Sequence, residues 1–127
     1  MSGDLQRRAW WAVAAWAVFV FVLTSLPGQA LPAPPIANLD KVAHFALYGV
    51  LGALVARAAN LSGWPRTWLV AAGLVALAGG ALDELHQLFI PGRASSALDW
   101  LMDATGAAAG LSLGTLMMKS RVSPWLR

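Results

Sequence analysis

Four long runs of apolar residues constrain this chain more than any other feature of its sequence. A membrane-spanning α-helix needs about 20 consecutive, mostly apolar residues. The runs cover residues 9–26, 42–61, 67–90 and 98–118. Only 12% of the 127 residues are charged, whereas soluble domains carry about 25% charged residues. The sequence therefore predicts an all-α, polytopic membrane protein. We expect a single domain over residues 1–127, a bundle of four transmembrane helices joined by short loops.

The first apolar run has a second interpretation. Arg7 and Arg8, the run itself and the small-residue stretch GQALPA (28–33) together resemble a cleavable signal peptide. However, the run is long for the apolar part of such a peptide, and its three tryptophans are more typical of a retained helix. We therefore expect a membrane helix. The proline-rich segment 27–40 that follows it is expected to form neither a helix nor a paired strand, and to cap one end of the bundle.

The distribution of basic residues predicts the orientation of the helices, because Lys and Arg are enriched in cytoplasmic loops. With both termini cytoplasmic, the inner side holds Arg7, Arg8, Arg57, Arg66, Lys119, Arg121 and Arg127, and the outer side holds Lys41 and Arg93. The tryptophans agree, with Trp10, Trp11, Trp64, Trp68 and Trp125 near inner boundaries and Trp100 near an outer one. The sequence predicts an N-in, C-in topology.

Charge and cysteine content exclude two other classes. The formal net charge of +3 is too small, and the basic residues too scattered, for a nucleic-acid-binding surface. The chain has no cysteine, which excludes a disulfide framework and a thiolate metal site.

Polar residues gather at the predicted outer end of the bundle. They are Asp40, Lys41 and His44 on the second helix, Asp83, Glu84, His86 and Gln87 on the third, Arg93 in the outer turn, and Asp99 and Asp103 on the fourth. Ionisable groups at membrane depth cost about 2.5–3.5 kcal/mol each on insertion scales, so they usually face the bundle interior and mark a functional site. We therefore expect a site at this end.

Helical periodicity predicts which residues face the interior. On the fourth helix Asp99 and Asp103 share a face with Gly106, Gly110 and Gly114, and glycines at this spacing allow a neighbouring helix to approach closely. We expect this face to pack within the chain rather than in a dimer. Lys41, His44, Tyr48 and Gly52 form a stripe on the second helix, and Asp83, His86 and Gln87 align with Ala76, Gly79 and Gly80 on the third. Glu84 is expected to face a different neighbour or the rim.

The five carboxylates at this end outnumber its two fixed cations. Either some carboxylates stay protonated or a further cation enters. A divalent metal would satisfy the excess; its predicted ligands are Asp83, Asp99 and His44. The same three residues are the candidate catalytic groups for proton transfer. The candidate substrate-binding residues are Arg93, Lys41, Glu84, Gln87, Asp40, Tyr48 and Asp103, and among them Arg93 could clamp a phosphate or carboxylate.

Three alternatives remain open at this point. The polar residues could form a structural hydrogen-bond network, or belong to a non-enzymatic accessory subunit with an unknown protein partner. They could also line an ion or proton pathway, although the predicted inner half of the bundle is almost without polar residues. Neither the oligomeric state nor the choice between binding and catalysis follows from these residues.

The chain resembles the VanZ-like family of small bacterial membrane proteins. The resemblance rests on three blocks: DKVAHFALYGVLG (40–52), LDELHQLFIPGRASSALDWL (82–101) and MDATGAAAG (102–110). The shared polar positions of the family fall on Asp40, Lys41, His44, Asp83, Glu84, Gln87, Arg93 and Asp99. Family members often have Asn where this chain has Asp103, which indicates that the position needs a short polar group; His86 is less central to the pattern.

The resemblance implies a location in the bacterial cytoplasmic (inner) membrane and an association with resistance to teicoplanin, an antibiotic that acts at the cell surface. It brings no established reaction. Together with the residues, it suggests a protein that binds or modifies an amphiphilic envelope molecule, either a lipid-linked wall precursor or a phospholipid.

Overall fold

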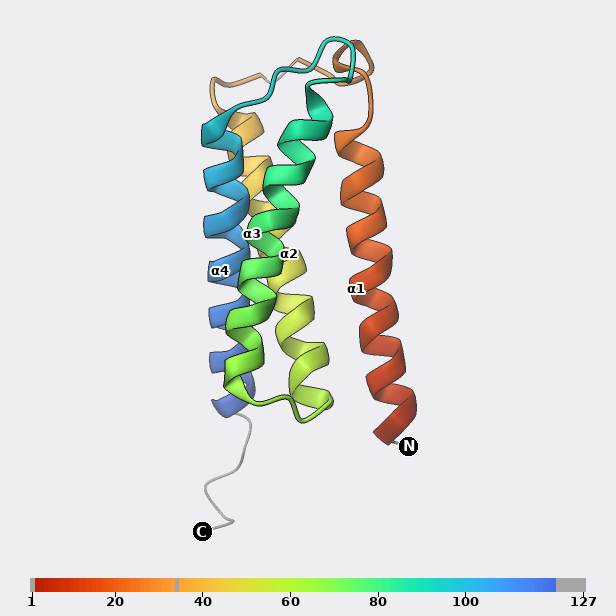
Figure 1. Cartoon of the computed structure of the whole chain (residues 1–127), viewed down its shortest axis with the longest axis vertical. Coiled ribbons are helices and arrows are strands. Elements are labelled where there is room, and N and C mark those ends of the chain that lie inside the picture. Colours follow the sequence, from red (N-terminus) through yellow and green to blue (C-terminus); the bar gives the residue numbers. More distant parts are fainter. Residues whose placement is uncertain (1, 34, 121–127) are drawn as a thin grey trace.

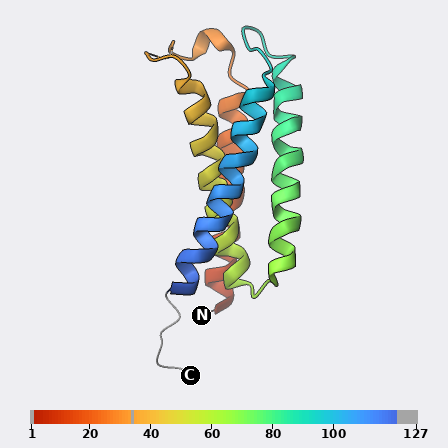
Figure 2. The same cartoon turned by 90° about the vertical axis from the view of Figure 1, so that its left-hand side faces the viewer.

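The computed structural model describes residues 2–33 and 35–120, and within them the fold is all-α. The helices are α1 (Ser2–Thr24), α2 (Leu39–Leu61), α3 (Arg66–Gln87) and α4 (Ala97–Ser120), with one short 3-10 helix, η1 (Gly28–Ala30). They run up and down along one axis (Figures 1 and 2). The segments 25–38 and 88–96 lie together at one end, which we call the loop end, and the start of α1 and the end of α4 lie at the other.

Three of the helices are long and apolar enough to cross a membrane, namely Gly3–Thr24, Leu39–Leu61 and Arg66–Gln87. The all-α prediction is therefore confirmed, and membrane crossing is supported for α1 to α3. α4 is of similar length but carries Asp99 and Asp103 in its first two turns. A membrane crossing by α4 and the N-in, C-in orientation stay predictions.

The helix boundaries differ from the predicted ones mainly where polar residues continue a helix beyond its apolar run. α1 begins at Ser2 rather than Ala9, and its polar first turns include an ion pair of 2.6 Å between Arg7 and Asp4. α3 ends at Gln87, before the predicted end at residue 90, because the chain turns there toward Pro91. Helices follow backbone hydrogen bonds, whereas the prediction followed hydropathy.

The proline-rich segment corrects one expectation. It was predicted to contain no helix, but Gly28–Ala30 forms a single 3-10 turn directly after Pro27, whose fixed φ suits the residue that precedes a helical turn. The amide of Gly28 donates a hydrogen bond of 3.0 Å to the carbonyl of Pro91. A Cβ atom on Gly28 would overlap the carbonyl of Gly92, which itself has a φ of 74°. The two loops therefore touch through backbone, and both glycines are needed there.

The closest helix pair is α2 with α4. A Cβ atom on Gly106 would overlap the carbonyl of Phe45, and one on Gly110 would overlap the carbonyl of Gly49. Gly52 of α2 approaches the Ala107 carbonyl in the same way. The glycine face of α4 thus packs inside the chain, as the periodicity predicted.

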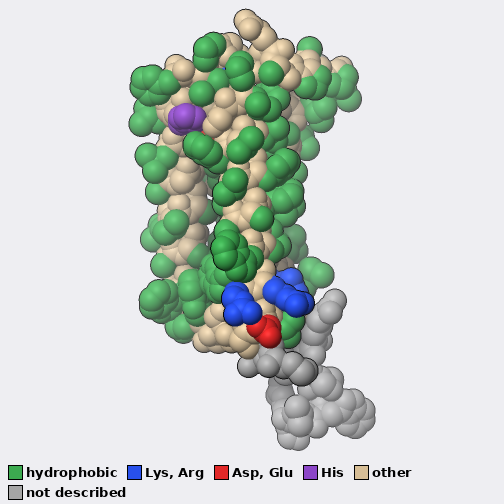
Figure 3. All heavy atoms as spheres, turned by 90° about the vertical axis from the view of Figure 1, so that its right-hand side faces the viewer, with side chains coloured by type: hydrophobic (Ala, Val, Ile, Leu, Met, Phe, Trp, Pro, Cys, Tyr) green, Lys and Arg blue, Asp and Glu red, His purple; other side chains and the backbone are tan. Residues whose placement is uncertain are grey.

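The distribution of side chains is the reverse of that usual in soluble proteins, because large apolar side chains lie on the surface and polar side chains lie in the interior. Large apolar side chains are exposed, with Phe89 at 79%, Val75 at 72% and Trp11 at 69%. The space-filling view shows hydrophobic side chains over much of one face, with a histidine near the top and lysine or arginine and an acidic group only at its lower end (Figure 3). Alanines and polar residues fill much of the interior. This arrangement suits a lipid environment.

Tryptophans gather at the end opposite the loop end. The rings of Trp10 and Trp64 lie 4.9 Å apart, those of Trp64 and Trp68 lie 5.5 Å apart, and Trp10 Nε1 donates to Ser62 Oγ at 3.0 Å. Amphipathic indole rings favour a membrane interface.

Other residues used for the topology prediction, namely Arg121, Trp125, Arg127 and the side chain of Lys119, lie outside the described part of the structure.

Candidate functional site

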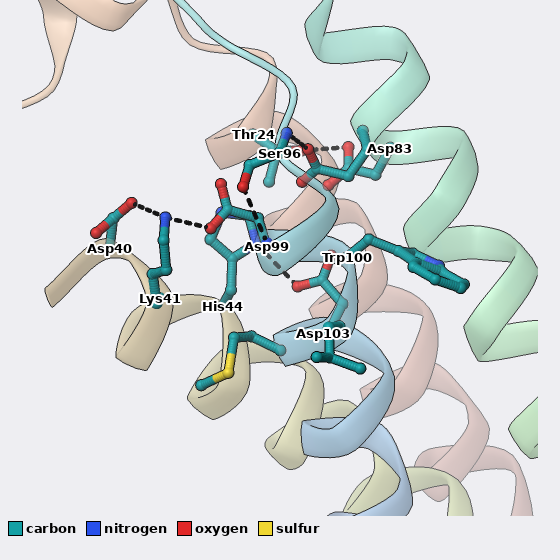
Figure 4. A network of polar contacts seen from close by, with 12 residues as sticks. Thr24, Asp40, Lys41, His44, Asp83, Ser96, Asp99, Trp100 and Asp103 are labelled. Carbon is teal, nitrogen blue, oxygen red and sulfur yellow. Dashed lines mark hydrogen bonds and ion pairs between the residues drawn. The ribbon is translucent and has the colours of Figure 1, made fainter. Parts of the chain in front are cut away.

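The loop end of the bundle contains a group of side chains that we call the polar cluster. Its members are Lys41 and His44 of α2, Asp83, Glu84 and Gln87 of α3, and Asp99 and Asp103 of α4. All of them except Lys41 are buried, and Lys41 is half-buried. Figure 4 shows side chains from separate helices converging there. The structure therefore brings together all three predicted catalytic residues and most of the predicted binding residues.

Lys41 joins the second and fourth helices at the edge of the cluster. Its Nζ atom lies 2.8 Å from Asp99 Oδ1 and 2.8 Å from Asp40 Oδ2 (Figure 4). Asp99 lies in the first turn of α4, and its amide donates to Ser96 Oγ at 3.4 Å, so Ser96 caps the helix. The side chain of Asp40 remains 49% exposed, whereas that of Asp99 is 9% exposed. The positive charge of Lys41 is therefore already shared between two carboxylates.

His44 and Asp103 form the most buried pair of the cluster. His44 Nδ1 lies 2.8 Å from Asp103 Oδ1, and Asp103 has no exposed surface. Gly80 of α3 makes room for this carboxylate, since a Cβ atom at Gly80 would lie 3.2 Å from the Cβ atom of Asp103. The pair thus links α2 and α4 at a point where α3 also passes.

Asp83 is held by Thr24, which is not among the predicted site residues. Thr24, at the end of α1 and only 3% exposed, donates a hydrogen bond of 2.8 Å to Asp83 Oδ1. The available signal was a hydroxyl residue near the loop end of the apolar run 9–26. This contact ties α1 to α3, two helices that otherwise touch little.

Glu84 accepts a hydrogen bond from the loop before α4. The amide of Ser96 donates to Glu84 Oε2 at 2.8 Å, and Glu84 is only 5% exposed. Of the two expected placements, facing another neighbour or lying at the rim, the structure shows the first. A backbone donor carries no side-chain signal, so this partner cannot be predicted from the sequence.

Four buried polar atoms of the cluster have no hydrogen-bond partner among the described residues. They are Asp83 Oδ2, Glu84 Oε1, Gln87 Nε2 and Asp103 Oδ2. In each of the three carboxylates one oxygen is held, by Thr24, Ser96 or His44, and the other is open. A buried polar atom without a partner costs about 1–3 kcal/mol. Four of them in one place favour an additional partner there, such as a ligand, an ion or water.

One group of residues could hold a metal ion. His44, Glu84 and Asp103 each offer a ligand atom within 4.8 Å of the other two. This group differs from the predicted ligands Asp83, Asp99 and His44. Asp99 is instead bound by Lys41, and Asp83 is bound by Thr24.

Three further predicted residues lie around the cluster. Arg93 is half-buried and forms no ion pair or side-chain hydrogen bond with the described residues. His86 Nε2 lies 3.2 Å from Ser25 Oγ, and its ring stacks on Phe21 at 5.3 Å, so it contacts α1 rather than the cluster. Tyr48 is 6% exposed and packs with Val20 and Ala107, which places an apolar layer beneath the cluster.

Below this layer the bundle has an apolar hollow of about 450 Å³. Its lining includes Trp10, Val13 and Ala17 of α1, Leu51 and Val55 of α2, and Ala72 of α3. None of the polar-cluster residues lines it. This hollow therefore lies in the apolar half of the bundle, apart from the polar cluster.

The fold and the cluster define a class, namely small α-helical membrane proteins with ionisable side chains buried at one end of the bundle. A family model described as VanZ/LLP1 matches residues 6–118, and the chain belongs to this family. The resemblance found in the sequence is thereby confirmed. Comparisons with curated proteins and with solved structures give no match.

Proposed function

We propose that this protein is a multi-pass protein of the bacterial cytoplasmic membrane that binds the polar head of an amphiphilic envelope molecule at its loop end. The head would belong to a lipid-linked wall precursor or a phospholipid. The observation that carries the proposal is Arg93, a half-buried cation without an ion pair among the described residues. Guanidinium groups bind phosphate through two parallel hydrogen bonds, which makes Arg93 a suitable anchor for an anionic head.

The surroundings of Arg93 favour an amphiphile over a free anion. Leu88 and Phe89, a few residues before it, are 59% and 79% exposed. A molecule whose head contacts Arg93 can therefore lay its acyl chains along the apolar surface of α3. Donor groups of the head, such as sugar hydroxyls, would meet the open carboxylate oxygens of the cluster.

One observation favours a second function, a non-enzymatic accessory subunit. The bonds of Lys41 to Asp99, of His44 to Asp103 and of Thr24 to Asp83 all join different helices. A cluster of this kind would also serve as a scaffold for a partner protein. The two functions differ in what co-purifies with the chain.

Native mass spectrometry of the full chain in a mild detergent tests the proposal. We expect the wild-type protein to retain a phosphate-bearing lipid, and Arg93→Gln to lose it. The matched control is Arg57→Gln, which removes an exposed arginine of α2 that lies away from the loop end. Equal retention by both variants, or a stoichiometric protein partner with no bound lipid, would overturn the proposal. In cells, teicoplanin susceptibility should change with Arg93→Gln and not with Arg57→Gln.

A further inference from the structure

The open oxygens of the polar cluster point to a metal site at a group that the sequence did not single out. We propose that His44, Glu84 and Asp103 bind one divalent transition-metal ion of the zinc type. The inference rests on the packing of α2, α3 and α4 and does not depend on lipid binding.

The ligand atoms have a suitable separation. Two ligand atoms on a tetrahedral zinc ion lie about 3.4 Å apart, because each bond is about 2.0–2.2 Å long. In the structure His44 Nδ1 and Asp103 Oδ1 are 2.8 Å apart, and the three residues offer atoms within 4.8 Å of one another. These distances bracket the required value, so small side-chain rotations would complete the site.

The burial of the ligands supports an ion rather than a solvated acidic patch. Asp103 is fully buried and Glu84 is 5% exposed, yet Asp103 Oδ2 and Glu84 Oε1 have no partner among the described residues. Buried carboxylates are normally paired or bind a metal. Both carboxylates belong to the same group of potential ligands as His44, and the three residues lie on three different helices, α3, α4 and α2.

Neither nearby fixed cation neutralises Glu84 or Asp103 in the structure. Lys41 is paired with Asp40 and Asp99, and Arg93 forms no ion pair with the described residues. The two positive charges of a zinc ion would offset the charges of Glu84 and Asp103. Such an ion would also let an anionic head approach an otherwise negative cluster, which connects the metal with the proposed function.

Further contacts would orient the ligands. Ser96 holds Glu84 Oε2 through its amide, which leaves Glu84 Oε1 open. Metal-binding carboxylates are commonly fixed in this manner by a hydrogen bond to the ligand. One imidazole with two carboxylates suits zinc or manganese, and zinc binds more tightly to a mixed nitrogen and oxygen site.

Zinc content of the tag-free full chain tests this site. After dialysis against low micromolar zinc and removal of loosely bound ions, we expect about one zinc ion per chain by elemental analysis. Zinc should raise the apparent melting temperature of the wild type, since the ion would join three helices, and magnesium should not replace it. Glu84→Gln, which keeps an acceptor for Ser96, should lose both the zinc and the temperature shift.

Two control variants lie outside the site. Asp40→Asn removes an exposed carboxylate at the same end, and His86→Gln removes the other histidine; both should retain zinc. If Glu84→Gln does not fold, cobalt absorption of the wild type gives an independent readout of nitrogen and oxygen ligands. Wild-type protein that holds no stoichiometric metal would overturn the proposal. So would a Glu84→Gln variant whose cobalt bands, like those of His86→Gln, are the same as in the wild type. If the protein binds no metal but still retains lipid, this inference fails and the proposed function stands.

Discussion

His44 Nδ1 lies 2.8 Å from Asp103 Oδ1, and this contact joins α2 and α4 where both helices are buried. Asp103 has no exposed surface, so any residue at this position must satisfy the imidazole without help from water. A short polar group is therefore required at this position. A carboxylate here has a second buried oxygen, Oδ2, that has no hydrogen-bond partner among the described residues.

The first prediction concerns this pair. Asp103→Asn keeps an acceptor for His44 and should leave the fold intact, whereas Asp103→Ala leaves the imidazole unpaired and should cost about 2–4 kcal/mol, from the lost partner and the cavity together. Unfolding in a denaturing detergent series, followed by circular dichroism, measures the difference. Equal stability of the two variants would contradict a requirement for hydrogen bonding at this position.

Close packing of α2 against α4 gives the second prediction. Gly110→Ala places a Cβ atom onto the carbonyl of Gly49 and should destabilise the protein by about 1–3 kcal/mol or more, since the opposing atom is backbone. Gly79→Ala is the matched control, because nothing lies within 4 Å of a Cβ atom there. In a helix interior that change should be neutral or stabilising by up to about 1 kcal/mol. The same loss in both variants would mean that the glycine face does not pack as described.

The third prediction tests the bond between α1 and α3. Thr24→Val removes the hydroxyl that donates to Asp83 and should cost about 1–3 kcal/mol, because a buried charged acceptor loses its partner. Thr105→Val is the control, since that hydroxyl is exposed and bonds only to its own helix. Both stabilities can be measured by thermal unfolding in one detergent. A larger loss in the control would rule out the Thr24 contact as a tie between the helices.

The two ion pairs of Lys41 should differ in strength. The Asp40 side chain is 49% exposed and that of Asp99 is 9% exposed, and exposed pairs contribute only about 0–1 kcal/mol. Double-mutant cycles with Lys41→Gln and either Asp40→Asn or Asp99→Asn should give the larger coupling energy for Asp99. A larger coupling energy between Lys41 and Asp40 would contradict the prediction, because it would mean that Lys41 pairs mainly with the exposed carboxylate and not with the cluster.

The predicted orientation can be tested because the chain has no cysteine. Single substitutions Ser95→Cys at the loop end and Asn60→Cys near the opposite end both lie at exposed positions. A membrane-impermeant maleimide should label Ser95→Cys on intact cells and should label Asn60→Cys only after lysis. The reverse pattern would invert the topology.

Much of the fold could be predicted because apolar length and glycine spacing act locally. The apolar runs indicated the helices, and the glycines at positions 106, 110 and 114 indicated the packed face of α4. The exact ends were harder to predict, since the polar residues Ser2 to Arg8 continue α1 beyond its apolar run.

The details of the cluster needed the structure because they depend on contacts between helices. A helical face places Lys41 near Asp99 but does not show that its long side chain reaches that carboxylate and pairs with it. The donors Thr24 and the Ser96 amide come from a helix end and a loop. The grouping of Glu84 with His44 and Asp103 follows from these contacts rather than from any spacing along the chain.

The central claim is that the polar cluster serves ligand binding and not only the joining of helices. Asp83→Asn tests it most directly, because the amide oxygen of Asn can still accept from Thr24 while the charge is removed. Membrane level, melting temperature and lipid retention should be measured together, with Asp4→Asn as the control. We expect unchanged level and stability with lost lipid retention; a variant that fails to accumulate, or one that retains lipid like the wild type, would contradict the claim.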